Sequence, residues 1–81
     1  MALLSAYEAA AASEPTWTRF EAADVCYEIR RRVNEGFAFA TARDHVFGRE
    51  EHRARIAKLV DGGWNERNPT LAWNAATMTG P

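Results

Sequence analysis

The sequence predicts a small, mainly α-helical domain that contains a helix-turn-helix and ends in a small β hairpin. Apolar residues recur at three- and four-residue steps over residues 19–34, which is the spacing of one helical face. The stretch 41–64 has the pattern of two short helices joined by a tight turn at Gly48. After Trp64 the chain becomes polar and rich in turn residues, and 70–73 is its most strand-like part.

An alanine-rich helix is expected at the N-terminus, over residues 2–13, because alanine has the highest helix propensity. Pro15 ends it. The chain is therefore expected to divide into an N-terminal helix at 1–14 and a main domain at 17–81. The apolar edge of the helix is thin, so the helix either packs on the flank of the domain or binds a partner. This edge consists of Leu3, Leu4, Tyr7 and Ala11.

The second helix is expected over residues 19–34 and is the best supported by the pattern. Thr18 and Glu21 match a capping box that would start it. Trp17 and Thr18 suit a short first strand, and Gly36 ends the helix. The buried face is expected to consist of Ala22, Val25, Cys26, Ile29 and Val33.

The helix-turn-helix is expected after an extended link that contains Phe37 and Phe39. Thr41 is a good N-cap for the first short helix, and Gly48 is expected to end that helix in the left-handed conformation. The second helix follows at 49–61. Its apolar stripe consists of His52, Ile56, Leu59 and Val60.

A resemblance to a known family appears at this point. The run RIAKLVDGGW, from Arg55 to Trp64, resembles the end of the recognition helix and the start of the wing in winged helix-turn-helix domains. The run FEAADV at 20–25 resembles the opening of that family's first helix. The resemblance covers residues 17–80 and implies a recognition helix at about 49–61 and a wing at about 64–80. The wing resembles that of small phage and actinobacterial regulators through Arg67, Asn74, Thr77, Thr79 and Gly80.

The resemblance implies that the chain binds double-stranded DNA, with the recognition helix in the major groove. Arginine suits contacts to phosphate and guanine, and glutamate can accept a hydrogen bond from the cytosine amino group. A domain of this size has a small footprint on DNA, which favours a homodimer or a tandem array. The expected DNA-binding residues are Arg49, Glu50, Arg53, Arg55, Lys58, Arg67 and Asn68.

The charge distribution is also compatible with a second class of function. The net charge is −1, which disfavours nonspecific DNA binding. Residues 1–29 carry one basic and five acidic residues, and residues 30–81 carry nine basic and six acidic ones. The alternative is a phage-type interaction protein that binds and modulates a host protein. Its expected apolar anchors are Leu4, Tyr7 and Trp73. Six further aromatic residues are expected in the core: Trp17, Phe20, Phe37, Phe39, Phe47 and Trp64.

Several other functions are excluded by the residue pattern. The single cysteine, Cys26, cannot form an internal disulfide and is expected to be a small buried residue in a reducing interior. His45 and His52 have no further ligands at metal-binding spacing, so no metal or other cofactor is expected. No nucleophile is paired with a base, so the chain is not expected to be an enzyme. With no membrane span and no signal peptide, we expect it in the cytoplasm of a bacterium or of a phage-infected host.

Overall fold

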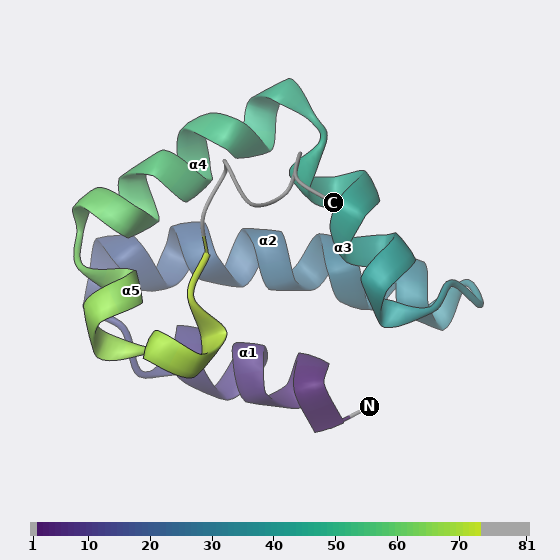
Figure 1. The fold of residues 1–81 in the computed structure, drawn as a ribbon, viewed down its shortest axis with the longest axis horizontal. Coiled ribbons are helices and arrows are strands. Elements are labelled where there is room, and N and C mark those ends of the chain that lie inside the picture. The colour runs from purple at the N-terminus through teal and green to yellow at the C-terminus, as the bar shows by residue number, and fades with distance from the viewer. Residues whose placement is uncertain (1, 74–81) are drawn as a thin grey trace.

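Helices make up all the regular structure in the computed structural model, which describes residues 2–73 (Figure 1). The elements in order are α1 (Ala2–Ala12), α2 (Thr16–Asn34), α3 (Phe39–Phe47), α4 (Glu50–Asp61), α5 (Trp64–Arg67) and the 3-10 helix η1 (Pro69–Leu71). The four longest lie close to the predicted helices.

The winged helix-turn-helix prediction is wrong for the described chain, because residues 2–73 contain no strand or sheet. Where the wing was expected, the chain forms α5 and η1 instead. Gly63 has φ +90°, which turns the chain sharply between α4 and α5. Pro69 stands at the first position of η1, where a missing amide donor is harmless. The rest of the expected wing, including Asn74, Thr77, Thr79 and Gly80, lies outside the described residues.

The longest helix, α2, is the centre of the molecule. In Figure 1 it runs across the middle, with α4 arching over it and α1 below it. It packs against α1, α3 and α4. Its predicted inner face is buried at Ala22, Val25, Cys26 and Ile29, and Val33 is partly buried against the same core. From α4, Ile56 and Leu59 complete this contact, each with no exposed surface.

The start of α2 differs from the prediction. The helix begins at Thr16, directly after Pro15, and the Arg19 amide donates to the Pro15 carbonyl at 2.7 Å. The expected strand and capping box are therefore absent. Thr18 lies inside the first turn with no exposed surface, and among the described residues its Oγ1 has no hydrogen-bond partner. Thr18 is thus a buried residue of the first turn and makes no capping hydrogen bond.

The link to α3 is shorter than expected. Helix α3 begins at Phe39 rather than at Thr41, because the Ala42 amide already donates to the Ala38 carbonyl at 2.9 Å. The Phe39 ring is 7% exposed and stacks on Tyr7 of α1 at 5.8 Å between ring centroids. Gly48 ends α3 with φ −76°, so its expected left-handed conformation is wrong.

An aromatic cluster forms part of the core between α1, α3 and α5. Trp73 stacks on Trp64 at 4.5 Å and on Tyr7 at 5.5 Å, and Phe47 meets its ring edge-on at 5.9 Å. The cluster joins α1, α3, α5 and the segment after η1. Leu4 is likewise fully buried, so the expected partner anchors Leu4, Tyr7 and Trp73 are core residues instead.

Candidate functional site

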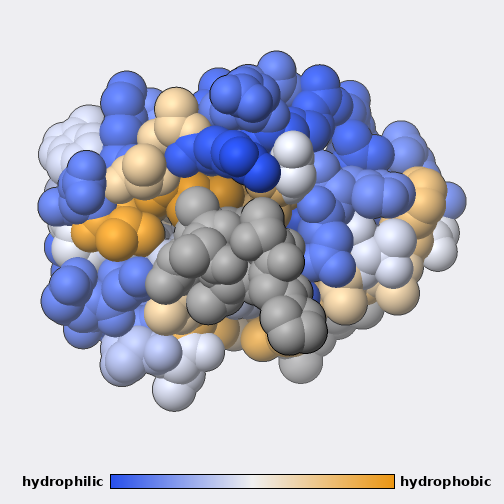
Figure 2. Space-filling model, turned by 45° about the horizontal axis from the view of Figure 1, so that its top comes forward, coloured by the Kyte–Doolittle hydropathy of each residue, from blue (hydrophilic) through white to orange (hydrophobic). Residues whose placement is uncertain are grey.

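The outer face of α4 is the surface on which the sequence places DNA binding. Figure 2 looks at the molecule from this side and shows mainly hydrophilic residues along its upper part. Arg49, Glu50, Arg53 and Lys58 are exposed there. The surface mixes charges of both signs, and Arg49 already forms an ion pair with Glu51 at 2.9 Å.

Two of the predicted cations on α4 are directed at α2. Arg55 lies 3.3 Å from a carboxylate oxygen of Glu21 and 3.1 Å from one of Asp24. Lys58 Nζ is 3.8 Å from the second oxygen of Glu21. These pairs join α4 to α2. A phosphate would have to compete with both carboxylates for the same side chains.

Arg67 and Asn68 lie on α5 and at its end, where they bind one buried carboxylate. The Arg67 guanidinium makes a hydrogen-bonded ion pair with Glu14, and Asn68 Nδ2 donates to the same carboxylate at 3.2 Å. Glu14 is 5% exposed. Arg67 Nη1 also donates to the Gly62 carbonyl at 2.7 Å. This network ties the turn between α1 and α2 to α5, which gives both residues a structural role.

Arg53 is the remaining cation of the predicted set, and within residues 2–73 it has no ion pair. It is exposed on α4. The seven predicted DNA-binding residues therefore do not form one basic surface. Three of the cations hold carboxylates of other elements, and Arg49, which precedes α4, pairs with Glu51 of its first turn. DNA binding by these residues stays a prediction.

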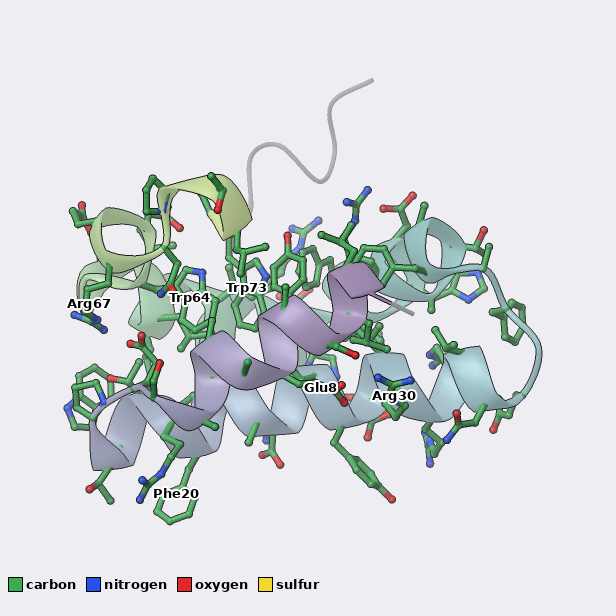
Figure 3. The ribbon with its side chains drawn as sticks, turned by 90° about the horizontal axis from the view of Figure 1, so that it is seen from below. Glu8, Phe20, Arg30, Trp64, Arg67 and Trp73 are labelled. Atoms are coloured by element: carbon green, nitrogen blue, oxygen red, sulfur yellow. The ribbon has the colours of Figure 1, made fainter. Side chains whose placement is uncertain are left out.

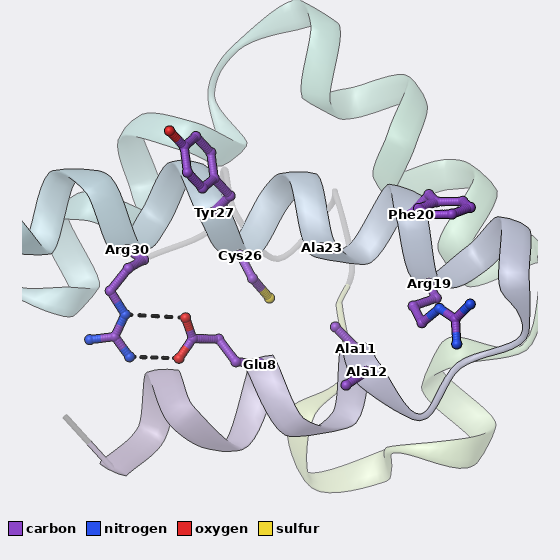
Figure 4. A pocket seen from close by; sticks show the side chains of 9 residues that line it. All are labelled: Glu8, Ala11, Ala12, Arg19, Phe20, Ala23, Cys26, Tyr27 and Arg30. Atoms are coloured by element: carbon purple, nitrogen blue, oxygen red, sulfur yellow. Dashed lines mark hydrogen bonds and ion pairs between the residues drawn. The ribbon is translucent and has the colours of Figure 1, made fainter.

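A different surface emerges between α1 and α2, where the structure has a groove of about 420 Å³. Its floor consists of small side chains, Ala11 and Ala12 from α1 and Ala23 and Cys26 from α2 (Figure 4). Small residues on both helices leave the space that a larger side chain would fill.

Two exposed aromatic rings border this groove. Phe20 is 64% exposed and Tyr27 is 63% exposed. They are seven residues apart on α2, which is about two helical turns, so both project from the same side. Figure 3 shows Phe20 projecting away from the body of the molecule. Tyr27 lies on the same outer side of α2, with Ala23 between the two rings (Figure 4).

The two ends of the groove carry different charge. At one end Arg30 makes a bidentate ion pair with Glu8, at 2.6 and 3.1 Å, which bridges α2 and α1. The hydrogen bond from Arg30 lowers the pKa of the Glu8 carboxyl, so this pair stays ionised at neutral pH. At the other end the Arg19 guanidinium lies over the Phe20 ring, 5.8 Å from its centroid. No carboxylate of the described chain pairs with Arg19.

Cys26 is the thiol that lines this groove. Burial raises the pKa of the Cys26 thiol to about 12, and the negative charge of Glu8 adds to the effect. The thiol is thus protonated at neutral pH and is a poor nucleophile. Cys26 is buried, as predicted for a small core residue. Within residues 2–73, no three histidine, cysteine or acidic side chains gather as a metal site would require.

The sequence prediction missed this groove because it assigned Phe20, which borders the groove, to the core. Trp17 and Phe37, which were also expected in the core, are likewise exposed. The sequence did contain a signal for the two exposed rings. On a helical wheel, Phe20 and Tyr27 lie opposite the buried face of α2, which is unusual for aromatic residues in a small domain. Trp17 is 55% exposed, but its ring packs so close to Gly62 that a Cβ there would stand 2.6 Å from it.

None of the described helices is both long enough and apolar enough to cross a membrane. Comparison with known protein families, with curated proteins and with solved structures finds no match. Two surfaces of the molecule bear on its function, the charged face of α4 and the groove between α1 and α2.

Proposed function

We propose that the chain is a protein-binding domain that receives a partner in the groove between α1 and α2. The observation that carries this proposal is the exposure of Phe20 and Tyr27, each about two-thirds exposed, beside a floor of alanines. Contiguous apolar surface of this kind typically marks an interaction site. Aromatic residues are enriched at such sites because a single ring buries much area at little cost in conformational entropy.

The rings are not required by the core. The core is closed by Leu4, Trp64 and Trp73 and by the inner face of α2, all of which are buried without them. Phe20 and Tyr27 leave apolar surface in contact with water in the isolated chain. A partner that covers them would remove this surface from water at about 25 cal/mol per Å².

The electrostatics favour a protein partner over duplex DNA. Arg55, Lys58 and Arg67 hold carboxylates of Glu21, Asp24 and Glu14. The chain has a net charge of −1. Affinity for duplex DNA depends on the neutralisation of phosphates, and cations that are already paired contribute little to it.

A selection from a displayed library of random 16-residue peptides tests the proposal. The full-length protein is the bait, and binders of a Phe20→Ser, Tyr27→Ser double variant are removed. We expect enriched peptides whose binding is lost in the double variant and retained in Arg53→Ser, an exposed change on α4. The double variant and Arg53→Ser change exposed residues only, so each should leave the melting temperature nearly unchanged.

A mobility-shift assay with duplex DNA tests the alternative function, DNA binding. A random-sequence duplex pool at about 50 mM salt and micromolar protein should show no mobility shift, since the unpaired cations of α4 are few. A shift that is lost in Arg53→Ala, together with a library that yields no peptide dependent on the two rings, would overturn the protein-binding proposal.

A further inference from the structure

We infer that the occupant of the groove is an amphipathic α-helix of a partner protein, with an aliphatic stripe and a carboxylate at the end that meets Arg19. This inference rests on the proposed function and adds the chemistry and polarity of the partner. It is carried by the shape of the groove and by the unequal charge of its two ends.

The floor and the rings define what fits. Phe20 and Tyr27 stand about 10 Å apart along α2, given a rise of about 1.5 Å per residue. Between them Ala23 leaves a gap that an aliphatic side chain can enter. Across the groove, Ala11 and Ala12 of α1 present no long side chain that would block a helix. A helix lying in such a groove inserts apolar residues at positions i, i+3 or i+4, and i+7.

The charges give the occupant a direction. Arg30 is satisfied by the bidentate contact with Glu8, at 2.6 and 3.1 Å, so that end attracts no further anion. Among residues 2–73, Arg19 has only the face of Phe20, at 5.8 Å, as a partner. The two arginines are eleven residues apart, which is about 16 Å along α2. A partner with one acidic end complements this pattern, because a charge-assisted contact to Arg19 replaces water there.

A helix fits the observations better than an acyl chain with a carboxylate head. Sites for small molecules usually enclose about 70–90% of the ligand. Here both bordering rings are nearly two-thirds exposed, so the groove is open along its side. A helix covers an open groove and its rims together, whereas a single acyl chain would leave the outer faces of both rings in water.

A second copy of the chain is a poor occupant. Placing two copies of α2 antiparallel, with Phe20 of one against Tyr27 of the other, fixes the register. Arg19 then falls within about one helical turn of Arg30 of the second copy, and Asp24 meets its own counterpart near the two-fold axis. Juxtaposition of like charges disfavours this pairing.

The test repeats the peptide selection on charge variants of the full-length protein. One bait is the natural chain, the second is Arg19→Glu, and the third is the matched control Arg53→Glu. On the natural chain and the control we expect enriched peptides with aliphatic residues at helical spacing and an acidic residue at one end. On Arg19→Glu the acidic position should change to lysine or arginine.

Measured affinities make the test quantitative. For a selected peptide, replacing its acidic residue by glutamine should weaken binding about threefold, the usual effect of one exposed ion pair. The same replacement should have no effect on binding to Arg19→Ser and its full effect on binding to Arg53→Ser. Arg19 is exposed, so these variants should keep their melting temperature, and that measurement confirms that each bait is folded.

The outcomes separate this inference from the function on which it rests. Enriched peptides that depend on Phe20 but carry no acidic preference, or that are not amphipathic at helical spacing, would overturn the inference and leave protein binding intact. An empty selection would overturn both. Binding of a medium-chain fatty acid such as decanoate that is lost in Phe20→Ser, with no peptide enriched, would show an acyl site instead.

Discussion

Trp73 stacks on Trp64 with 4.5 Å between ring centroids and 19° between the ring planes. The stack sets the path of the chain after α4. Trp64 Nε1 donates to the Leu71 carbonyl at 3.2 Å, and the Trp73 amide donates to the Asn65 side chain at 2.7 Å. These contacts fold residues 64–73 back over the core as two short helical turns, in the place where the sequence predicts a hairpin.

Trp73→Ala should therefore destabilise the protein by about 3–5 kcal/mol, the usual cost of truncating a buried tryptophan. The indole is 1% exposed and contacts Tyr7, Phe47 and Trp64. Urea denaturation followed by circular dichroism measures the change. Phe20→Ala is the matched control on an exposed ring and should shift stability by no more than about 0.5 kcal/mol. Equal losses in the two variants would contradict the closing role of Trp73.

Arg67→Ala should destabilise the fold, because it leaves the buried Glu14 carboxylate without its guanidinium partner. Glu14 is 5% exposed, and Asn68 alone would still donate to it at 3.2 Å. Thermal unfolding is the measurement, with Arg53→Ala as the control that breaks no ion pair of the described chain. If Arg67 instead served to contact DNA, its loss would weaken DNA binding and leave the unfolding temperature unchanged.

The helices could be predicted from local pattern more readily than their ends. The stripe of Val25, Ile29 and Val33 is visible in the sequence and specifies the inner face of α2. The start of the helix is ambiguous locally, because Thr18 and Glu21 match a capping box while Pro15 equally permits an earlier start. Burial of Thr18 against the core decides between them, and burial depends on tertiary packing.

The wing and the site depend on contacts between distant residues. Asparagine and proline after Trp64 are typical both of hairpins and of short helical turns, and the Trp64–Trp73 stack selects the second. The pairing of Arg67 with Glu14 spans 53 residues and has no local signature. The groove also requires α1 to lie beside α2. Only the outward position of Phe20 and Tyr27 could be predicted from the helical wheel.

Cys26 should be unreactive toward a thiol reagent such as Ellman's reagent at pH 8 in the folded protein. Its side chain is 3% exposed, and burial raises the pKa of the thiol to about 12, so little thiolate forms. In about 8 M urea the thiol should react fully and at the rate of a free cysteine. Complete reaction in native buffer within the dead time would show that the floor of the groove opens readily to solvent.

His52 should make the fold sensitive to acid. Its side chain is 3% exposed, and burial is the main cause that lowers the pKa of the imidazole, followed by the nearby charge of Arg55. Glu51 and Glu28 act in the opposite direction, and Arg49 adds to the lowering. The folded state therefore holds the neutral imidazole more strongly than the unfolded chain does, whose histidine titrates at about 6.5.

Proton linkage gives the direction in which the free energy of unfolding changes with pH. Above about pH 6.5 the imidazole is neutral in both states, and its burial costs nothing extra. Below that value the unfolded chain binds a proton that the folded chain resists, so the free energy of unfolding falls until the lowered pKa is reached. Urea titrations between pH 8 and pH 5 should show this decline, and His52→Gln should flatten it. The control is His45→Gln, which replaces the other histidine of the chain at an exposed position of α3. A slope that persists in His52→Gln would place the acid sensitivity elsewhere.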